Sequence, residues 1–116
     1  MATIKSYSDL QQSKKLAEFL PLESADMFFI CVGNREIIRI NDNIKDYNHW
    51  DTYPAWSLAA LLEVLKNKIV YGGNDSENWF VSYTKKNPTK TIFIYKENLI
   101  DACYEAILNL NKEELL

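Results

Sequence analysis

The single histidine of this sequence, His49, has the side chain best suited to proton transfer near neutral pH. It lies within Tyr47-Asn48-His49-Trp50-Asp51, two residues before Asp51. A histidine beside a carboxylate can act as an oriented general base or as a metal ligand. A zinc site needs three or four ligands, and the others would have to be acidic side chains or the two cysteines in apolar runs. A loop histidine without a chemical role is therefore the favoured interpretation.

Three carboxylates, those of Asp26, Asp101 and Glu105, would converge if the first strand and the last helix were neighbours. Paired carboxylates permit acid–base catalysis or the binding of a divalent cation. Each has a simpler role, because Asp101 lies in the first turn of an expected helix and Asp26 precedes an expected strand. A small enzyme or metal-dependent protein that uses these acidic residues with His49 and Asp51 is the alternative hypothesis. We expect no catalytic residue, no metal site and no cofactor.

Two further motifs carry no chemistry. Gly72-Gly73-Asn74 lacks the Gly-Lys-Ser/Thr that completes a phosphate-binding loop. The connection over residues 85–90 is basic, but it holds only three lysines. A solvated hairpin tip is therefore favoured over a phosphate contact.

The segment over residues 44–56 concentrates large aromatic side chains and shows no helical or strand period. Loops normally run over the surface, and Trp and Tyr combine a large contact area with a hydrogen-bonding tip. Such residues are enriched at binding hot spots. The competing interpretation is a lid, in which the rings fold back over one end of the core. The predicted partner-binding site consists of Tyr47, His49, Trp50, Tyr53 and Trp56.

Composition and charge limit the class of protein. The chain has 116 residues, of which 47% are hydrophobic and 25% charged, and this mix is typical of one globular domain spanning residues 1–116. The net charge of −3 gives no electrostatic drive toward nucleic acid or an anionic membrane. No apolar stretch approaches the ~20 residues of a membrane span, and the first residues lack an apolar h-region, so we expect no signal peptide. We expect a soluble, cytoplasmic protein in which Cys31 and Cys103 are buried thiols.

Three helices are expected. The first begins at Ser8, whose spacing to Gln11 matches a capping box, and Pro21 ends it. Ser57 caps the second helix, which is apolar on almost all sides and is predicted to be the most buried. Asn98 caps the last helix, which has the cleanest amphipathic period of the chain. The residues predicted to be almost wholly buried are Leu61, Leu62, Ala102, Cys103 and Ile107.

Two hairpins and one short strand complete the predicted elements. The pair Gly33-Asn34 separates the first two strands and is typical of a tight turn with positive φ at glycine. Hairpins joined by helices disfavour a doubly wound parallel fold. The sequence therefore predicts a single two-layer α+β domain, with an antiparallel or mixed sheet from two hairpins and about three helices mainly on one face. The predicted strands cover residues 27–32, 36–40, 69–71, 79–83 and 91–95.

Three stretches carry a resemblance to known proteins: Ser24-Ala25-Asp26-Met27, residues 54–65 with their Trp-Ser-Leu-x-Ala-Leu-Leu motif, and Asn98-Leu99-Ile100-Asp101-Ala102. Over residues 8–110 the chain resembles a group of small uncharacterised proteins encoded by phages and mobile elements of gut Bacteroidetes. Similar proteins often place a proline after the leucine-rich helix, where this chain has Lys66-Asn67-Lys68.

The group has no assigned reaction, so the resemblance implies no catalytic residue. It implies an accessory protein of a phage or mobile element. Together with the aromatic segment and the acidic charge, it leads us to expect a non-catalytic protein-binding module. The expected partner is a host or phage protein or, in a homodimer, a second copy of the chain, and not nucleic acid or a membrane.

Overall fold

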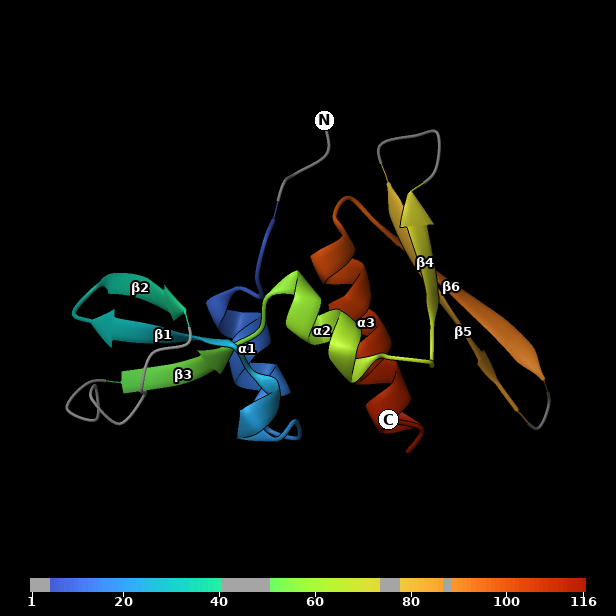
Figure 1. Ribbon diagram of the computed structural model, residues 1–116, viewed down its shortest axis with the longest axis horizontal. Coiled ribbons are helices and arrows are strands. Elements are labelled where there is room, and N and C mark those ends of the chain that lie inside the picture. Colours follow the sequence, from blue (N-terminus) through green and yellow to red (C-terminus); the bar gives the residue numbers. More distant parts are fainter. Residues whose placement is uncertain (1–4, 41–50, 74–77, 87–88) are drawn as a thin grey trace. The chain divides into compact units, whose positions relative to one another are not determined.

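The structure is a computed structural model that describes residues 5–40, 51–73, 78–86 and 89–116. Within these residues the chain forms three α-helices, one 3-10 helix and two three-stranded antiparallel sheets (Figure 1). The predicted α+β class and antiparallel pairing are confirmed. The two hairpins belong to different sheets, because each one pairs with a third strand of its own. No helix of the described residues is long and apolar enough to cross a membrane.

The chain divides into two compact units. One consists of residues 7–60, and the other of residues 1–6 together with residues 61–116. Each unit holds one of the two sheets. The single domain over residues 1–116 stays a prediction.

The sheet of residues 7–60 has β1 (Met27–Val32) at its centre, between β2 (Arg35–Ile40) and β3 (Asp51–Ala55). The turn from β1 to β2 has the predicted positive φ at Gly33, +60°. The segment over residues 44–56, which shows no strand period in sequence, nevertheless contains a strand: residues 51–55 pair with β1 and place Pro54 opposite Phe28. A proline without an N–H donor is tolerated there because β3 is an edge strand.

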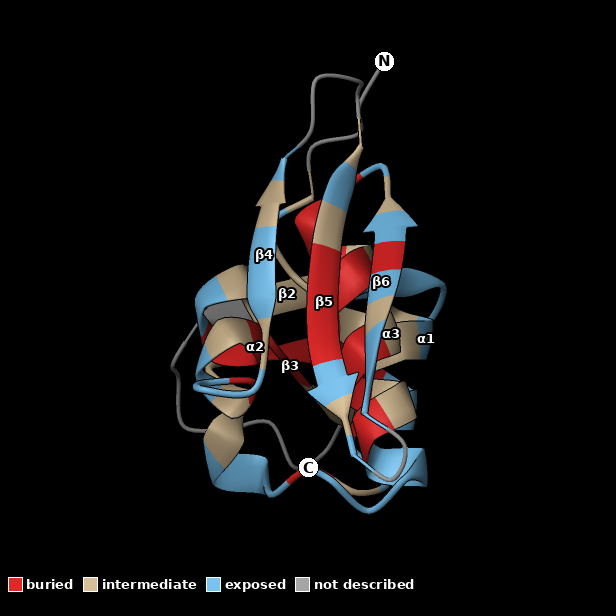
Figure 2. Cartoon of the chain, turned by 90° about the vertical axis from the view of Figure 1, so that its right-hand side faces the viewer, coloured by how far each residue is buried: buried red, intermediate tan, exposed pale blue. Residues whose placement is uncertain are grey.

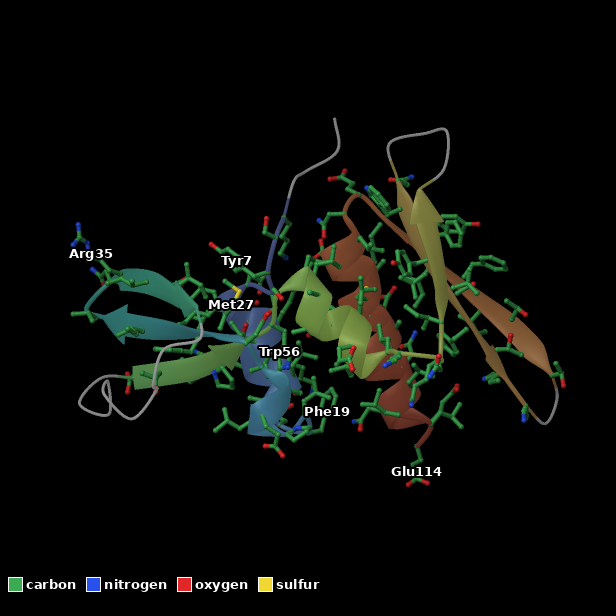
Figure 3. The ribbon with its side chains drawn as sticks, viewed as in Figure 1. Tyr7, Phe19, Met27, Arg35, Trp56 and Glu114 are labelled. Atoms are coloured by element: carbon green, nitrogen blue, oxygen red, sulfur yellow. The ribbon has the colours of Figure 1, made fainter. Side chains whose placement is uncertain are left out.

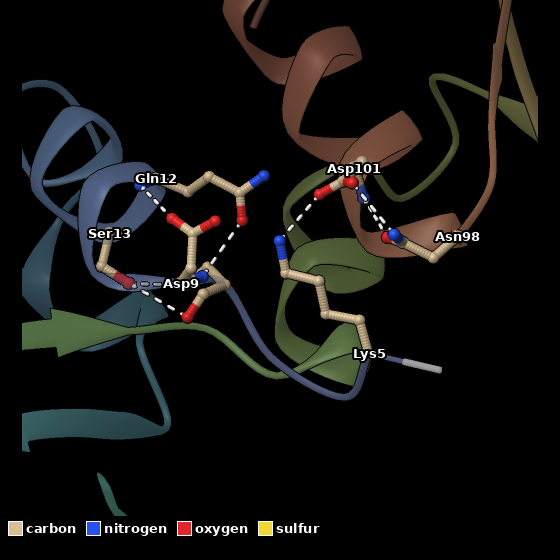
Figure 4. A network of polar contacts seen from close by, with 7 residues as sticks. Lys5, Asp9, Gln12, Ser13, Asn98 and Asp101 are labelled. Carbon is tan, nitrogen blue, oxygen red and sulfur yellow. Dashed lines mark hydrogen bonds and ion pairs between the residues drawn. The ribbon is translucent and has the colours of Figure 1, made fainter. Parts of the chain in front are cut away.

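Helix α1 (Leu10–Leu16) begins one residue later than predicted. Its N-cap is Asp9, whose Oδ1 accepts the N–H of Gln12 at 2.8 Å, and the Gln12 Oε1 accepts the N–H of Asp9 at 3.0 Å (Figure 4). Ser8 is instead buried and shares a 2.7 Å hydrogen bond with the Ser13 hydroxyl. The helix ends at Ala17, before the predicted stop at Pro21, and a 3-10 helix, η1 (Leu22–Ser24), follows.

Helix α2 (Leu58–Val64) has the predicted cap, because the Ser57 Oγ accepts the N–H of Ala60 at 3.2 Å. Asp26 holds this cap: its carboxylate accepts the N–H of Ser57 at 2.9 Å and also the Ser57 hydroxyl. The burial prediction holds for Leu61 and is wrong for Leu62, which is half-buried. Successive helix positions are rotated by about 100°, so Leu62 turns partly away from the side that buries Leu61 and Leu65.

The sheet of residues 61–116 has β5 (Trp79–Lys85) at its centre, between β4 (Val70–Gly73) and β6 (Lys90–Lys96). Helix α3 (Leu99–Lys112) packs on β5 and β6 and covers one face (Figure 1). Its predicted N-cap is confirmed, since the Asn98 Oδ1 accepts the N–H of Asp101 at 2.8 Å. This helix, not α2 as predicted, has the longest buried stripe: Leu99, Ile100, Ala102, Cys103, Ala106, Ile107 and Leu110.

The C-terminus of α3 closes in a Schellman motif. The N–H of Leu115 donates to the Leu110 carbonyl at 2.8 Å, and that of Glu114 donates to the Asn111 carbonyl at 3.0 Å. Glu114 takes the left-handed position, with φ +59°, where glycine is usual. The motif brings Leu115 back to the end of the helix.

Candidate functional site

The predicted partner-binding residues are only partly described by the structure. Three of them, Tyr47, His49 and Trp50, lie outside the described residues. Tyr53 is half-buried in β3, where the Lys14 Nζ lies 4.7 Å from the centre of its ring. Trp56, labelled in Figure 3, is 0% exposed, and its indole N–H donates to the Ser24 Oγ at 2.9 Å. The ring of Trp56 therefore belongs to the core and presents no surface to a partner.

The candidate carboxylates each bind a group of their own compact unit. Asp101 accepts the Lys5 ammonium at 2.8 Å (Figure 4), Glu105 lies 3.7 Å from the Lys96 Nζ, and Asp26 holds the cap of α2. Asp51, the neighbour of the histidine segment, is exposed at the start of β3. Among the described residues, no three His, Cys, Asp or Glu side chains are arranged to hold a metal ion.

The two cysteines are free, as predicted, but differ in burial. Cys103 is buried in α3, and this burial raises the pKa of its thiol to about 12. Cys31 is half-buried in β1, so the prediction of two buried thiols holds for Cys103 alone. A thiol with so high a pKa is a poor nucleophile near neutral pH, and Cys103 is a structural residue.

A group of exposed apolar side chains lies on the face of β4-β5-β6 opposite α3. The strand register pairs Phe80 with Tyr95 and Ser82 with both Val70 and Phe93, so that these residues share one face. Phe93, Tyr95 and Val70 are 54%, 55% and 65% exposed. Figure 2 looks onto this side of the sheet and shows that β4 and β6 are largely exposed while the middle of β5 is buried. We call Val70, Phe80, Phe93 and Tyr95 the aromatic face.

The three rings of the aromatic face contact one another. The centre of the Phe80 ring lies 6.2 Å from that of Phe93 and 6.3 Å from that of Tyr95. The rings of Phe93 and Tyr95 are stacked, with their centres 6.2 Å apart. Phe80 also covers Gly72 on β4, where an added Cβ would come within 3.1 Å of the Phe80 ring. Rings at such distances support one another's orientation. The aromatic face is therefore preorganised and not a set of independent side chains.

Phe93 and Tyr95 lie on the face of β6 that α3 does not cover, so the helix–sheet core does not account for them. A signal for this face was present in the sequence, because β6 alternates Ile92 and Ile94 with these two aromatic residues. An antiparallel strand with one solvated face normally alternates apolar and polar side chains. A strand that is apolar on both faces indicates that the second face is also covered, or is available for binding.

A cleft of about 590 Å³ adjoins the aromatic face at the end of the sheet where the β5–β6 connection lies. It shares the exposed Val70 and Thr84 with the sheet face, so the two surfaces are continuous. Of the residues that the structure describes, two lysines and no acidic side chain line it. We call it the basic cleft, and its lining consists of Asn67, Lys68, Ile69, Val70, Ser82, Tyr83, Thr84, Lys86, Leu110 and Leu115.

Lysines give this end of the sheet a positive charge. Lys85 is neutralised by Glu113 at 2.9 Å, and this contact raises the lysine pKa. Lys68, Lys86 and Lys90 are exposed, and none of them forms an ion pair with another residue that the structure describes. Three positive charges therefore remain available to an acidic partner here.

Tyr83 lies at the boundary between the basic cleft and the α3 side of the sheet. Burial, followed by the nearby Glu113 carboxylate, raises the pKa of its phenol, while a hydrogen bond to Asn109 opposes the shift. The phenol is thus a neutral group at physiological pH and adds no negative charge to the cleft.

Comparisons with protein-family models, with curated proteins and with solved structures found no match to this chain.

Proposed function

We propose that the chain is a non-catalytic protein-binding module and that the aromatic face contacts its partner. The observation that carries this proposal is the pair of stacked, half-exposed rings of Phe93 and Tyr95 on a sheet face opposite the covering helix. Half of two aromatic side chains, together with Val70, amounts to roughly 300 Å² of exposed apolar surface. Contiguous apolar patches of this size on soluble proteins often mark binding sites.

The charge distribution favours a protein partner over single-stranded nucleic acid. Aromatic platforms that bind single strands combine stacking with a positively charged groove that follows the phosphate backbone. Here the unpaired lysines gather at one end of the sheet, and the net charge of the chain is −3. A polypeptide with apolar side chains and a local acidic group fits both the rings and the lysines.

The resemblance carried by the Trp-Ser-Leu-x-Ala-Leu-Leu motif supplies the biological setting of the proposal. On that basis the chain is a cytoplasmic accessory protein of a phage or mobile element, and its partner is a host or phage protein. The aromatic segment over residues 44–56 stays a second predicted contact region, through Tyr47, His49 and Trp50.

The test compares binding by three forms of the full chain: wild type, the double variant Phe93→Ser/Tyr95→Ser, and the control Tyr71→Ser. Tyr71 is 50% exposed, like Phe93 and Tyr95, but it lies on the opposite face of the same sheet. It therefore controls for the loss of an exposed aromatic ring outside the aromatic face. The three baits are incubated with lysate of a Bacteroidetes host, and each captured protein is purified and titrated. A partner whose affinity falls more than tenfold with the double variant, and less than twofold with Tyr71→Ser, supports the proposal.

Two further measurements distinguish the other occupants. A fluorescent dT15 oligonucleotide that binds wild type but not the double variant would make nucleic acid the ligand and overturn the proposal. Sedimentation of the isolated chain that shows a dimer lost in the double variant would identify a second copy as the partner. Equal binding of every partner by wild type and double variant would remove the aromatic face from consideration.

A further inference from the structure

The basic cleft is continuous with the aromatic face, so a segment bound to one reaches the other. Val70 of the aromatic face is 65% exposed, and it also lines the cleft. Its volume of about 590 Å³ is within the range of ligand-binding clefts and exceeds what one side chain needs.

The lining of the cleft combines positive charge with apolar walls. Lys68 and Lys86 supply the charge, and Ile69, Leu110 and Leu115 supply the walls. An anionic group with an aliphatic stem or neighbour satisfies both parts of this lining. Lysine without arginine or a helix N-terminus is a point charge, which suits a carboxylate and lacks the bidentate geometry that favours phosphate.

Backbone hydrogen bonds hold both sides of the cleft. On one side the N–H of Lys68 donates to the Leu65 carbonyl at 2.9 Å, next to Asn67 with its left-handed φ of +65°. On the other side the 2.8 Å hydrogen bond from Leu115 to Leu110 fixes the tail against the end of α3. A cleft whose rims are fixed in this way costs little to order on binding.

We infer that the partner carries an aspartate or glutamate beside its apolar segment, and that the basic cleft receives this carboxylate between Lys68 and Lys86. The inference rests on the proposed function and adds the chemistry of the partner to it. The apolar segment lies on the aromatic face, and the acidic residue lies at the end of the sheet.

The test is a selection of random dodecapeptides displayed on phage against the full chain. We expect the enriched peptides to place Asp or Glu next to aromatic or aliphatic residues. A synthetic peptide of the consensus is then titrated by fluorescence anisotropy, together with a version in which each acid is replaced by its amide. The acid form should bind wild type about ten times more tightly than the amide form, because it makes charge-assisted hydrogen bonds.

The charge-reversed variant Lys68→Glu/Lys86→Glu separates the cleft from the general charge of the chain. It should bind the acidic peptide at least tenfold more weakly and show no preference for acid over amide. The control Lys66→Glu/Lys112→Glu reverses two exposed lysines outside the cleft lining and should retain wild-type affinity within about twofold. Repeating the selection on the charge-reversed variant should enrich Lys or Arg at the former acidic position.

Failure of the inference is distinguishable from failure of the proposed function. Suppose that the selected peptides lose binding with Phe93→Ser/Tyr95→Ser. If they then show no acidic consensus, or bind the charge-reversed variant as well as wild type, the cleft assignment is overturned and the proposed function stands. If no enriched peptide depends on Phe93 and Tyr95, or none is enriched, both fall. A phosphoserine version that binds more than tenfold tighter than the Asp and Glu versions overturns the choice of carboxylate.

Discussion

Adjacent residues of β6 should differ sharply in their contribution to stability, because they point to opposite faces of the sheet. Ile94 is 5% exposed and belongs to the core, whereas Phe93 is 54% exposed on the aromatic face. Slightly under half of the Phe93 side chain is buried, which is about 90 Å² and worth at most about 2 kcal/mol. Threonine keeps part of that contact and has a high β propensity, so Phe93→Thr should cost about 1 kcal/mol.

Ile94→Thr should be far more destabilising. It replaces a buried ethyl group by a hydroxyl in an apolar site, so we expect a loss of about 3 kcal/mol. Urea denaturation of both variants, followed by far-UV circular dichroism, measures the difference at constant m-value. If Phe93→Thr proves as costly as Ile94→Thr, then Phe93 is covered in solution, and the aromatic face is not a free surface of the isolated chain.

Three further outcomes follow from the same structure. Asp26→Ala removes the carboxylate that accepts the N–H and the hydroxyl of Ser57, so it should lower the free energy of unfolding by about 2 kcal/mol. The control Asp51→Ala changes an exposed residue and should alter the free energy of unfolding by less than about 0.5 kcal/mol; urea titrations measure both. Cys103 keeps its proton to about pH 12 when folded and to about pH 9 when unfolded. The folded state therefore binds the extra proton, and stability should fall as pH rises from 9 toward 12, with a slope that Cys103→Ala reduces. Glu114→Gly relieves the left-handed backbone and should raise the melting temperature, at a gain of about 0.5–1 kcal/mol.

Helix caps were predictable where one local arrangement was clearly best. Asn98 and Ser57 each accept an N–H three residues ahead, and the sequence separation alone identifies such a pair. At α1 the sequence offers two equivalent boxes, Ser8 with Gln11 and Asp9 with Gln12. A distant residue decides between them, since the Ser8 hydroxyl accepts the N–H of Trp56 at 3.1 Å.

The elements that were misjudged depend on contacts between distant segments. Residues 51–55 form a strand by pairing with β1, and Pro54 is tolerated because β3 is an edge strand. Trp56 belongs to the aromatic segment in sequence, but it directly follows the buried end of β3 and shares the core with it. Aromatic clustering in sequence does not distinguish a surface from a core, because both need large apolar side chains.

The aromatic face is the clearest case in which periodicity needs tertiary information. The alternation of β6 assigns Ile92 and Ile94 to one face and Phe93 and Tyr95 to the other, but it does not say which face α3 covers. Tyr83 identifies the covered face, because its hydrogen bond to Asn109 of α3 places the Tyr83 side of the sheet against the helix. Once that side is known, the opposite aromatic residues have no role in the helix–sheet core.

Gly72 connects this surface to the backbone beneath it. A glycine inside a strand lowers stability because it loses more conformational freedom on folding and offers no side chain to pack. Here the missing side chain provides the space in which the Phe80 ring lies, with 3.1 Å left to a hypothetical Cβ. Phe80 is consequently half-buried and supports Phe93 and Tyr95, which are the more exposed rings. The aromatic face thus consists of a half-buried ring on the central strand, Phe80, and two more exposed rings on the edge strand, Phe93 and Tyr95. This division explains why substitutions at Phe93 and Tyr95 should affect binding more than folding, and why the partner should meet β6 first.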